Sequence, residues 1–345
     1  MPGSKDALLL TTSGAADLLG VHSSTVKRWS DEGALPTSKT EGGHRRIHLK
    51  DILATAEAKG IDTFLDTFHP WEANVWLAVR QVIRKGDFRR LRSLALSWLS
   101  QGEGDLLGHL FYQVGRRPEI SLPRFLDEGI RDFMVMVGEE WRGGRLEVGE
   151  EHMATQVIQE VLLRLRKGWE RHPLPRGPVE DLPVAVVGAM EGDEHDMGAQ
   201  VVRVLLEQEE WRVYYLGANV PVEEFASVQA AQAAKLVCIS FSPKNTLPDI
   251  QRAIKVLGEF YRPRLPYALA VGGTLQDVSP EELSPGPFED LSFSRSGRDF
   301  LAWLRSSPCD GSTEEAKEPS EPGHPDSEPA FPEETREHPD QETVI

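Results

Sequence analysis

Apolar residues along the chain follow two different periods, which change near residue 180. Before that point they recur every three or four positions, as at Trp76, Val79 and Val82, and this spacing predicts amphipathic helices. Beyond it, short apolar runs such as Val184 to Val187 alternate with further helical patterns. The change of period predicts a helical domain followed by an α/β domain.

Four amphipathic runs make up the helical part, residues 71–170. They are separated by breaks at residues 102–104, 117–118 and 143–144, where glycine or proline interrupts the pattern. Runs of this kind predict a four-helix bundle whose apolar residues form the core. Trp71, Trp76 and Trp98 are therefore expected to serve packing.

The α/β part, residues 183–306, alternates strands with helices. Strands are expected at residues 184–187, 213–216, 236–240 and 267–271, with a helical pattern after each. This alternation predicts a Rossmann-like parallel sheet with helices on both faces. Polar or small residues follow three of these strands, and the carboxyl ends of parallel strands share one edge of the sheet. We expect that edge to hold a ligand.

A third pattern occupies residues 1–60. Two short helices are expected on either side of a turn at Gly20, and the second helix carries Thr25, Lys27 and Arg28 on exposed positions. A glycine turn with basic residues follows at 40–47 and predicts a β-hairpin wing. The pattern is that of a winged helix-turn-helix domain. Polar residues 61–70 and the proline-rich residues 171–182 are expected to be linkers.

The formal net charge of −17 is unevenly distributed. From Ser307 to the end, the chain carries twelve Asp or Glu against Lys317 and Arg336, which accounts for −10 of the total. Residues 1–55 instead carry seven Lys or Arg and six Asp or Glu. The N-terminal region therefore keeps a local basic face suited to nucleic acid. Residues 307–345, rich in Pro and Glu, are predicted to form an acidic disordered tail.

Cysteine content and hydropathy indicate the cellular compartment in which the protein occurs. Only Cys238 and Cys309 are present, so a disulfide framework is not expected. No apolar run approaches the roughly 20 residues that span a bilayer, and the first residues lack the pattern of a secretory signal. We therefore expect a cytoplasmic protein without a membrane partner.

The loop at residues 192–198 places His195 between a strand and a helix. Asp193 stands two residues before it and can bind one ring nitrogen while the other stays free for a metal; Gly198 allows close backbone approach. From these residues alone, His195 is a metal ligand, a general base or a solvent-facing side chain. A zinc site lacks further ligands at the right spacing and a dinucleotide site lacks its glycine motif, whereas a nucleophile paired with His195 stays open.

The N-terminal residues resemble the DNA-binding domain of the MerR family of regulators. The resemblance covers about sixty residues and rests on the Gly-Gly-His-Arg-Arg wing with the preceding Trp29 and Pro36. It implies that the second helix enters the major groove and that the wing contacts the DNA backbone. The residues that it implicates in DNA binding are Thr25, Lys27, Arg28, His44, Arg45 and Arg46.

Residues 193–198, Asp-Glu-His-Asp-Met-Gly, and the two later strand ends resemble the cobalamin-binding domain of methionine synthase and several mutases. The resemblance implies that His195 binds cobalt from below, that Asp193 orients His195, and that Gly198 belongs to the same site. It further implies a channel for the displaced nucleotide tail of the cofactor. The residues that line this channel would be Ser240, Ser242, Gly272 and Gly273.

The order of the three domains resembles the CarH/LitR group of light-responsive transcriptional regulators. That group carries Trp, nine residues and Glu-His in its bundle, and here Trp141 is followed by nine residues before Glu151 and His152. The resemblance implies that this trio covers the upper face of adenosylcobalamin. It also implies a homotetramer that binds a double-stranded DNA operator and represses transcription in the dark, and that leaves the DNA on photolysis. The chain is not expected to be an enzyme.

One position departs from the pattern of this group. The residue after the tryptophan is a histidine that binds cobalt after photolysis, whereas here it is Arg142, whose permanently charged side chain cannot bind a metal. His152 is a substitute ligand, or water remains on the cobalt. Two other functions stay open: a light-independent cobalamin-sensing regulator, and a corrinoid carrier subunit of a methyltransferase.

Overall fold

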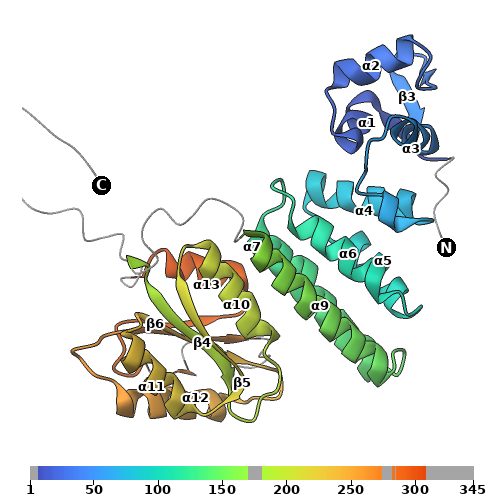
Figure 1. Cartoon of the computed structure of the whole chain (residues 1–345). Helices are drawn as coiled ribbons and strands as arrows, with labels where there is room; N and C mark the ends of the chain where they lie inside the picture. Colours follow the sequence, from blue (N-terminus) through green and yellow to red (C-terminus); the bar gives the residue numbers. More distant parts are fainter. Residues whose placement is uncertain (1–6, 170–180, 274–281, 284, 308–345) are drawn as a thin grey trace, which may run out of the picture. The chain divides into compact units, whose positions relative to one another are not determined.

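The computed structural model describes residues 7–169, 181–273, 282–283 and 285–307 (Figure 1). Nearly all of the expected linker at 171–182 lies outside the described residues. The same holds for Cys309 and for the expected acidic tail beyond Ser307.

The N-terminal domain is the helix-turn-helix with a wing that the sequence predicts. Gly20 ends the first helix in the left-handed conformation, with φ 64°. The wing is an antiparallel hairpin that turns at Gly43, with φ 76°, and a further strand pairs with its outer side. The elements are α1 (Thr12–Leu19), α2 (Ser23–Asp31), α3 (Leu49–Ala58) and a sheet of order β1-β3-β2 formed by β1 (Leu9–Thr11), β3 (Arg45–His48) and β2 (Ser38–Lys39).

The connection at residues 61–70 packs more closely than its polar sequence suggests. It contains the 3-10 turn η1 (Asp66–Phe68), and both Leu65 and Phe68 are buried. The Phe68 ring stacks on that of Trp98, with the ring centroids 6.0 Å apart. These contacts anchor the connection on the helical domain.

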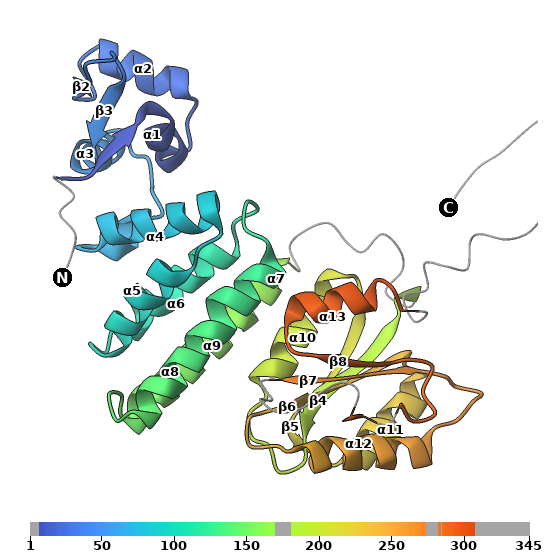
Figure 2. The same ribbon diagram turned by 180° about the vertical axis from the view of Figure 1, so that it is seen from behind.

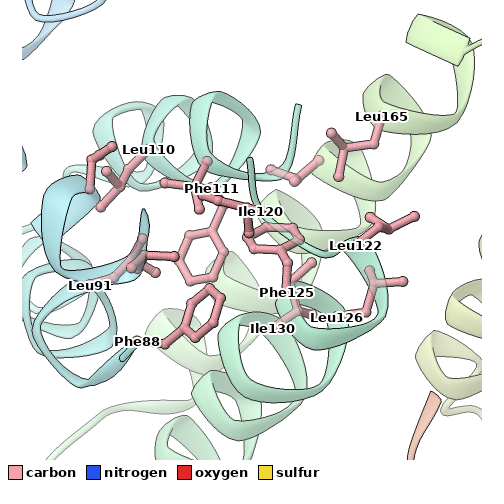
Figure 3. Packing of buried hydrophobic residues seen from close by; sticks show 14 of the residues in the cluster. Phe88, Leu91, Leu110, Phe111, Ile120, Leu122, Phe125, Leu126, Ile130 and Leu165 are labelled. Atoms are coloured by element: carbon pink, nitrogen blue, oxygen red, sulfur yellow. The ribbon is translucent and has the colours of Figure 1, made fainter. Parts of the chain in front are cut away.

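The helical domain contains a helix that none of the four apolar runs predicts. Residues 104–115 also form a helix, which the glycines at its two ends conceal in the sequence pattern. Its Phe111 packs against Phe125 and Phe133 in an aromatic core, part of which Figure 3 shows. The helices are α4 (Glu72–Lys85), α5 (Arg89–Leu99), α6 (Gly104–Gly115), α7 (Leu122–Arg124), α8 (Asp132–Arg142) and α9 (Val148–Trp169).

Between α7 and α8 lies the π-helical turn η2 (Phe125–Arg131). The backbone is helical at both junctions, so α7, η2 and α8 form one continuous helix with a wider turn inside it. Such turns alter the direction of the side chains that they carry and often occur at functional sites.

The α/β domain is a five-stranded parallel sheet of order β5-β4-β6-β7-β8, as predicted in kind. Helices α10 and α13 cover one face and α11 and α12 the other (Figure 1). Neighbouring strand residues such as Val186 and Val187 point to opposite faces, so both faces are apolar and each packs against helices. The strands are β4 (Val184–Met190), β5 (Arg212–Val220), β6 (Leu236–Phe241), β7 (Ala268–Gly273) and β8 (Leu291–Ser294). The helices are α10 (Met197–Gln208), α11 (Val222–Gln232), α12 (Leu247–Phe260) and α13 (Gly297–Leu304).

The edge strand β8 is absent from the predicted pattern. It has four residues and pairs with β7 alone. Figure 2 shows it beside β7. So short a strand carries too few alternating positions to stand out in a sequence. Its carboxyl end nevertheless lies beside Gly272, at the edge where the site is expected.

We predict that Phe111→Ala destabilises the helical domain by about 3–5 kcal/mol, because it removes a fully buried ring from the aromatic core. Urea unfolding monitored by circular dichroism measures this change. Leu163→Ala is the control, because Leu163 is exposed on α9 and its loss should cost less than about 0.5 kcal/mol. Equal losses from the two variants would contradict the assignment of Phe111 to the core.

Candidate functional site

The loop that carries His195 (residues 191–196, here the His195 loop) joins β4 to α10 at the carboxyl edge of the sheet. The side chain of His195 is 55% exposed, whereas Asp193 beneath it is completely buried. Asp193 Oδ1 lies 3.1 Å from His195 Nδ1 and accepts the backbone N–H of His195 at 3.0 Å. With its proton on Nδ1, the ring keeps Nε2 as the nitrogen that can bind a metal.

Asp193 also ties the loop to the next strand end. Its Oδ2 accepts the backbone N–H of Ser242, just beyond β6, at 2.8 Å. The carboxylate therefore receives three hydrogen bonds, which satisfy a charge that would be costly to bury alone. This network joins two segments that the sequence placed at one site.

Asn219 is a further residue of the site that the sequence analysis did not identify. Its side-chain oxygen accepts the N–H of Gly192 at 2.8 Å, and its side-chain nitrogen donates to Glu194 at 3.0 Å. Its backbone N–H donates to the carbonyl of Asp193 at 3.0 Å. Asn219 thus holds the His195 loop from the end of β5, with a left-handed φ of 54° that asparagine tolerates better than most residues. Its position at a strand end was the available signal.

Asp196 ends the loop and connects it to the helical domain. Its Oδ1 accepts from Gln159 of α9 at 3.3 Å, and its Oδ2 accepts from the hydroxyl of Tyr215 at 2.6 Å. Burial, and then the hydrogen bond to Asp196, raise the pKa of the Tyr215 phenol well above its usual range. Tyr215 therefore stays protonated and donates this bond at all ordinary pH values.

Three glycines of the predicted site permit close packing at the sheet edge. A Cβ on Gly198 would collide with Ser240 Oγ, which fills the space beside the first turn of α10. A Cβ on Gly272 or Gly273 would collide with the backbone carbonyl of a neighbouring strand, and Gly273 has a φ of 148°. Gly198 therefore serves packing against Ser240 as well as approach to the cavity.

A cavity of about 1490 Å³ opens at this edge and is bounded by both domains. It exceeds the roughly 300–1,000 Å³ of an ordinary small-molecule pocket. Ten residues were predicted for the cofactor site, and nine of them line it; Asp193 lies behind His195. The nine are Trp141, Glu151, His152, His195, Gly198, Ser240, Ser242, Gly272 and Gly273.

The helical domain supplies the opposite wall through α8 and α9. Glu151 accepts from Thr155 Oγ1 at 3.1 Å and lies 3.2 Å from His152 Nδ1. Arg142 also lines the cavity, and its Nε–H donates to the carbonyl of Gly138 at 3.1 Å. The predicted trio therefore does meet at one end of the bundle.

Large apolar side chains on this wall are open to the cavity. Val135, Trp141 and Val148 are 40%, 45% and 52% exposed, and all three line it. A group of exposed apolar side chains in a concave wall indicates a binding surface for an apolar ligand face.

Comparison with protein families assigns both walls of the cavity. Residues 183–290 and residues 78–166 each match a family model described as a B12 binding domain. Residues 9–60 match a helix-turn-helix domain. The chain belongs to the B12-binding family. The α/β domain and the helical domain are thus its two B12-binding domains.

Individual relatives of this B12-binding chain fall into two kinds. Dimethylamine corrinoid protein 3 of Methanosarcina mazei is 30% identical over 36% of this chain and 71% of its own length. Its namesake in Methanosarcina acetivorans is 27% identical over 41% of this chain, which spans 65% of that protein, less than two thirds. The HTH-type transcriptional repressor CarH of Myxococcus xanthus is 25% identical, over 74% of this chain and 85% of its own length.

The residues of the cavity fit a cobalamin. The cavity is large enough for more than an ordinary ligand, one wall offers an imidazole backed by a buried carboxylate, and the other is apolar. Among the described residues, no group of three or more His, Cys, Asp or Glu could hold a metal ion by itself. A single imidazole suits a metal whose remaining ligands come from a macrocycle, as in haem proteins.

The residues predicted to contact DNA lie on the N-terminal domain. Lys27 and Arg28 of α2 are exposed, as is His44 in the wing, whereas Thr25 is partly buried. Arg45 forms an ion pair with Asp31 at the end of α2, and Arg46 Nη1 donates to the carbonyl of Arg45 at 3.2 Å. The wing is therefore fixed to the helix that would enter the groove. No helix of the described chain is both long and apolar enough for a membrane span.

We predict that Asn219→Gly weakens binding of hydroxocobalamin by roughly 30-fold, because two hydrogen bonds of about 1 kcal/mol each no longer hold the His195 loop. Glycine is chosen because it accepts the left-handed backbone without strain. Absorbance titration of the full chain measures the affinity.

The control is Tyr214→Phe, which removes a hydrogen bond to Arg212 near the other end of the same strand. This variant should bind hydroxocobalamin as the unaltered chain does. Wild-type affinity in Asn219→Gly would show that the His195 loop needs no support from β5.

Proposed function

We propose that this chain is a light-responsive transcriptional repressor that uses adenosylcobalamin as its chromophore. The observation that carries the proposal is the single cavity in which His195 of the α/β domain faces Trp141 and Glu151 of the helical domain. A DNA-binding fold stands on the same chain as this cavity. The similarity to a transcriptional repressor over most of the chain supports the same function.

The two walls of the cavity have different tasks. His195, held by Asp193, would be the ligand for the cobalt of a bound cobalamin, and Ser240, Ser242 and the glycines of β7 would line the channel for its nucleotide tail. Trp141 provides a flat apolar surface for the adenosyl group, and Glu151 provides a carboxylate that accepts hydrogen bonds from it. Bound adenosylcobalamin supplies a cobalt–carbon bond that visible light breaks.

The response to light arises in the helical domain. In the dark, Trp141 and Glu151 would contact the adenosyl group, and this contact favours one arrangement of α8 and α9 relative to the sheet. Without this contact, the exposed apolar wall no longer favours that arrangement. The equilibrium between arrangements of α8 and α9 relative to the sheet then shifts. Arg142 cannot replace the lost group as a metal ligand. His152, which lines the same cavity, or water would take that role.

DNA binding requires several copies of the chain. One helix-turn-helix domain offers few cations to phosphates, and Arg45 is already paired with Asp31. Few ionic contacts give weak binding at physiological salt, whereas linked copies raise the effective affinity strongly. A dark homotetramer on a double-stranded operator meets this requirement, and its dissociation releases the DNA.

We predict that the full chain loaded with adenosylcobalamin in the dark elutes as a tetramer and binds an operator duplex selected from random sequence. Green light should change the absorption spectrum, lower the mass and weaken DNA binding by at least about 10-fold, as expected when avidity is lost. Sizing chromatography and fluorescence anisotropy measure the two effects. Hydroxocobalamin-loaded protein is the control and should not respond to light.

The outcome separates the proposal from its two alternatives. Equal mass and equal DNA binding in dark and light, with cobalamin bound, would instead indicate a light-independent cobalamin-sensing regulator. The corrinoid carriers among the relatives motivate the other alternative. Methylation of the bound cobalamin by a corrinoid methyltransferase, with no binding to any duplex, would favour a carrier protein over a regulator.

We also predict that Trp141→Ala weakens binding of adenosylcobalamin by roughly 10-fold or more, because an aromatic contact worth about 1–3 kcal/mol is lost. Trp141 is largely open to the cavity, so the fold should tolerate this change. The light-dependent change in mass should diminish with it. Leu163→Ala, on the side of α9 outside the cavity lining, is the control and should retain both properties.

A further inference from the structure

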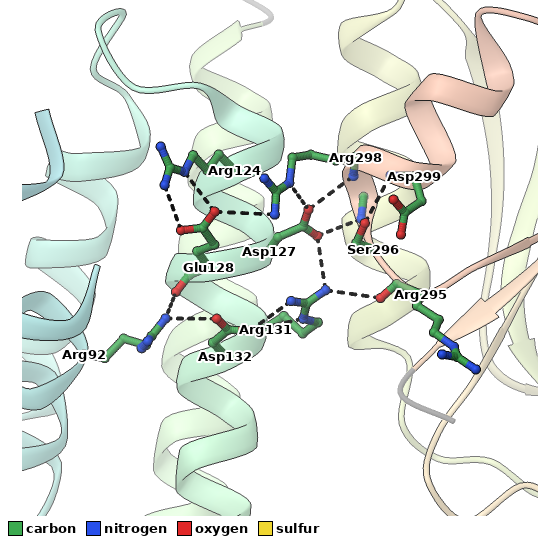
Figure 4. A network of polar contacts seen from close by, with 11 residues as sticks. Arg92, Arg124, Asp127, Glu128, Arg131, Asp132, Arg295, Ser296, Arg298 and Asp299 are labelled. Atoms are coloured by element: carbon green, nitrogen blue, oxygen red, sulfur yellow. Dashed lines mark hydrogen bonds and ion pairs between the residues drawn. The ribbon is translucent and has the colours of Figure 1, made fainter. Parts of the chain in front are cut away.

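Asp127 is a buried carboxylate that joins the two halves of the B12 site. It belongs to η2 of the helical domain and is 2% exposed. Its Oδ1 accepts the backbone N–H of Gly297 at 2.7 Å, and its Oδ2 accepts the backbone N–H and the Nε–H of Arg298, each at 3.2 Å (Figure 4). Gly297 and Arg298 begin α13, so a residue of one domain caps a helix of the other.

The π-helical turn lets one short segment serve both domains. Phe125 lies on this turn and is buried in the aromatic core of the helical domain (Figure 3). Asp127, two residues later, faces α13 instead (Figure 4). The core therefore fixes the position from which Asp127 reaches the α/β domain.

A second side chain of the turn strengthens the same joint. Arg131 Nη1 donates to the carbonyl of Arg295, which follows β8, at 3.1 Å, and lies 3.7 Å from Asp127 Oδ1. Asp127, Arg131, Arg295 and Gly297 all line the cavity. The joint thus stands at the margin of the cofactor site, and its geometry fixes the separation of the two walls there.

Asp127 differs from the other polar contacts that connect the domains. Arg166 of α9 pairs with Glu207 of α10, and both side chains are more than 20% exposed, so water can replace this contact. Water cannot replace Asp127 in this way, because its carboxylate is buried and two of its donors are backbone N–H groups of fixed direction. Loss of a buried charged partner is among the costliest changes at an interface.

We propose that Asp127 is a positioning residue that holds the helical-domain wall against the His195 wall and thereby selects cobalamins that carry a large upper group. The affinity of a ligand that contacts both walls depends on their separation, whereas the affinity of a ligand held by the α/β wall alone does not. When the joint is weakened, part of the binding free energy of the first kind of ligand is needed to bring the walls together, and its affinity falls. The inference rests on the proposal that Trp141 and Glu151 contact the upper group of adenosylcobalamin.

The test compares two ligands on the full chain in the dark. Asp127→Asn keeps the size of the side chain but removes its charge, and it places an amide N–H toward one of the donors of α13. Affinity for adenosylcobalamin should fall by roughly 10-fold or more, and affinity for hydroxocobalamin by less than about threefold. Absorbance titration gives both values, and their ratio is the readout.

Asp87→Asn is the matched control. Asp87 accepts hydrogen bonds from Gln81 and from the backbone and side chain of Arg89, all within the helical domain and outside the cavity lining. This variant should leave the ratio of the two affinities unchanged. A similar shift in both variants would overturn the assignment, since it would reflect general weakening of the helical domain.

Arg298→Ala provides a second variant that does not endanger folding. The Arg298 side chain is 54% exposed, and its truncation leaves the two backbone hydrogen bonds of Asp127 in place. The ratio should shift in the same direction by about threefold, as expected for the loss of one partly exposed hydrogen bond to Asp127, since the ion pair of Arg298 with Glu128 is exposed and contributes little. An unchanged ratio in Arg298→Ala and Asp127→Asn, or equal losses for both ligands, overturns the inference. Failure of the unaltered chain to bind either cobalamin would instead contradict the proposed function.

Discussion

The contact of the buried Asp193 carboxylate with His195 is the interaction on which the site depends. A carboxylate without access to water is tolerated only when donors surround it, and here these are the ring and backbone of His195 and the backbone of Ser242. The same three bonds fix the tautomer of the imidazole, the path of the His195 loop and the end of β6. One electrostatic requirement therefore organises the loop, the neighbouring strand end and the metal-binding nitrogen together.

The opposite wall obeys a different constraint, which is packing rather than charge. Its apolar side chains are supplied by helices whose other faces form the aromatic core around Phe111 and Phe125. A close-packed core transmits displacement instead of absorbing it. A change in what covers Trp141 is therefore expected to move helices as units, and the joint at Asp127 resists or permits that movement. In the proposed function, the polar wall therefore anchors the ligand and the apolar wall responds to its upper group.

The sequence was sufficient for features that depend on local pattern and insufficient for those that depend on tertiary contact. Strand alternation predicted the parallel sheet, and every residue predicted at the strand ends except Asp193 lines the cavity. Asn219 was missed because its function lies in three hydrogen bonds to a loop distant in the sequence. The helix at residues 104–115 was concealed by its terminal glycines, and β8 by its length. In the sequence, Asp127 looks like any other carboxylate on a helix, because the residues around it reveal neither the π-helical turn nor the contact with α13.

The position of the DNA-binding domain limits how the cavity can influence it. Arg80 of α4 pairs with Asp17 of α1 at 2.8 Å, and Gly14 of α1 lies against Trp76 of α4, whereas the cavity is lined by η2, α8 and α9. Between them stand α5 and α6, so a signal must cross the core of the helical domain or act through contacts between copies. A rigid displacement of one recognition helix would alter few phosphate contacts. Separation of linked copies removes the avidity of all of them at once, which makes control of assembly the more effective use of this architecture.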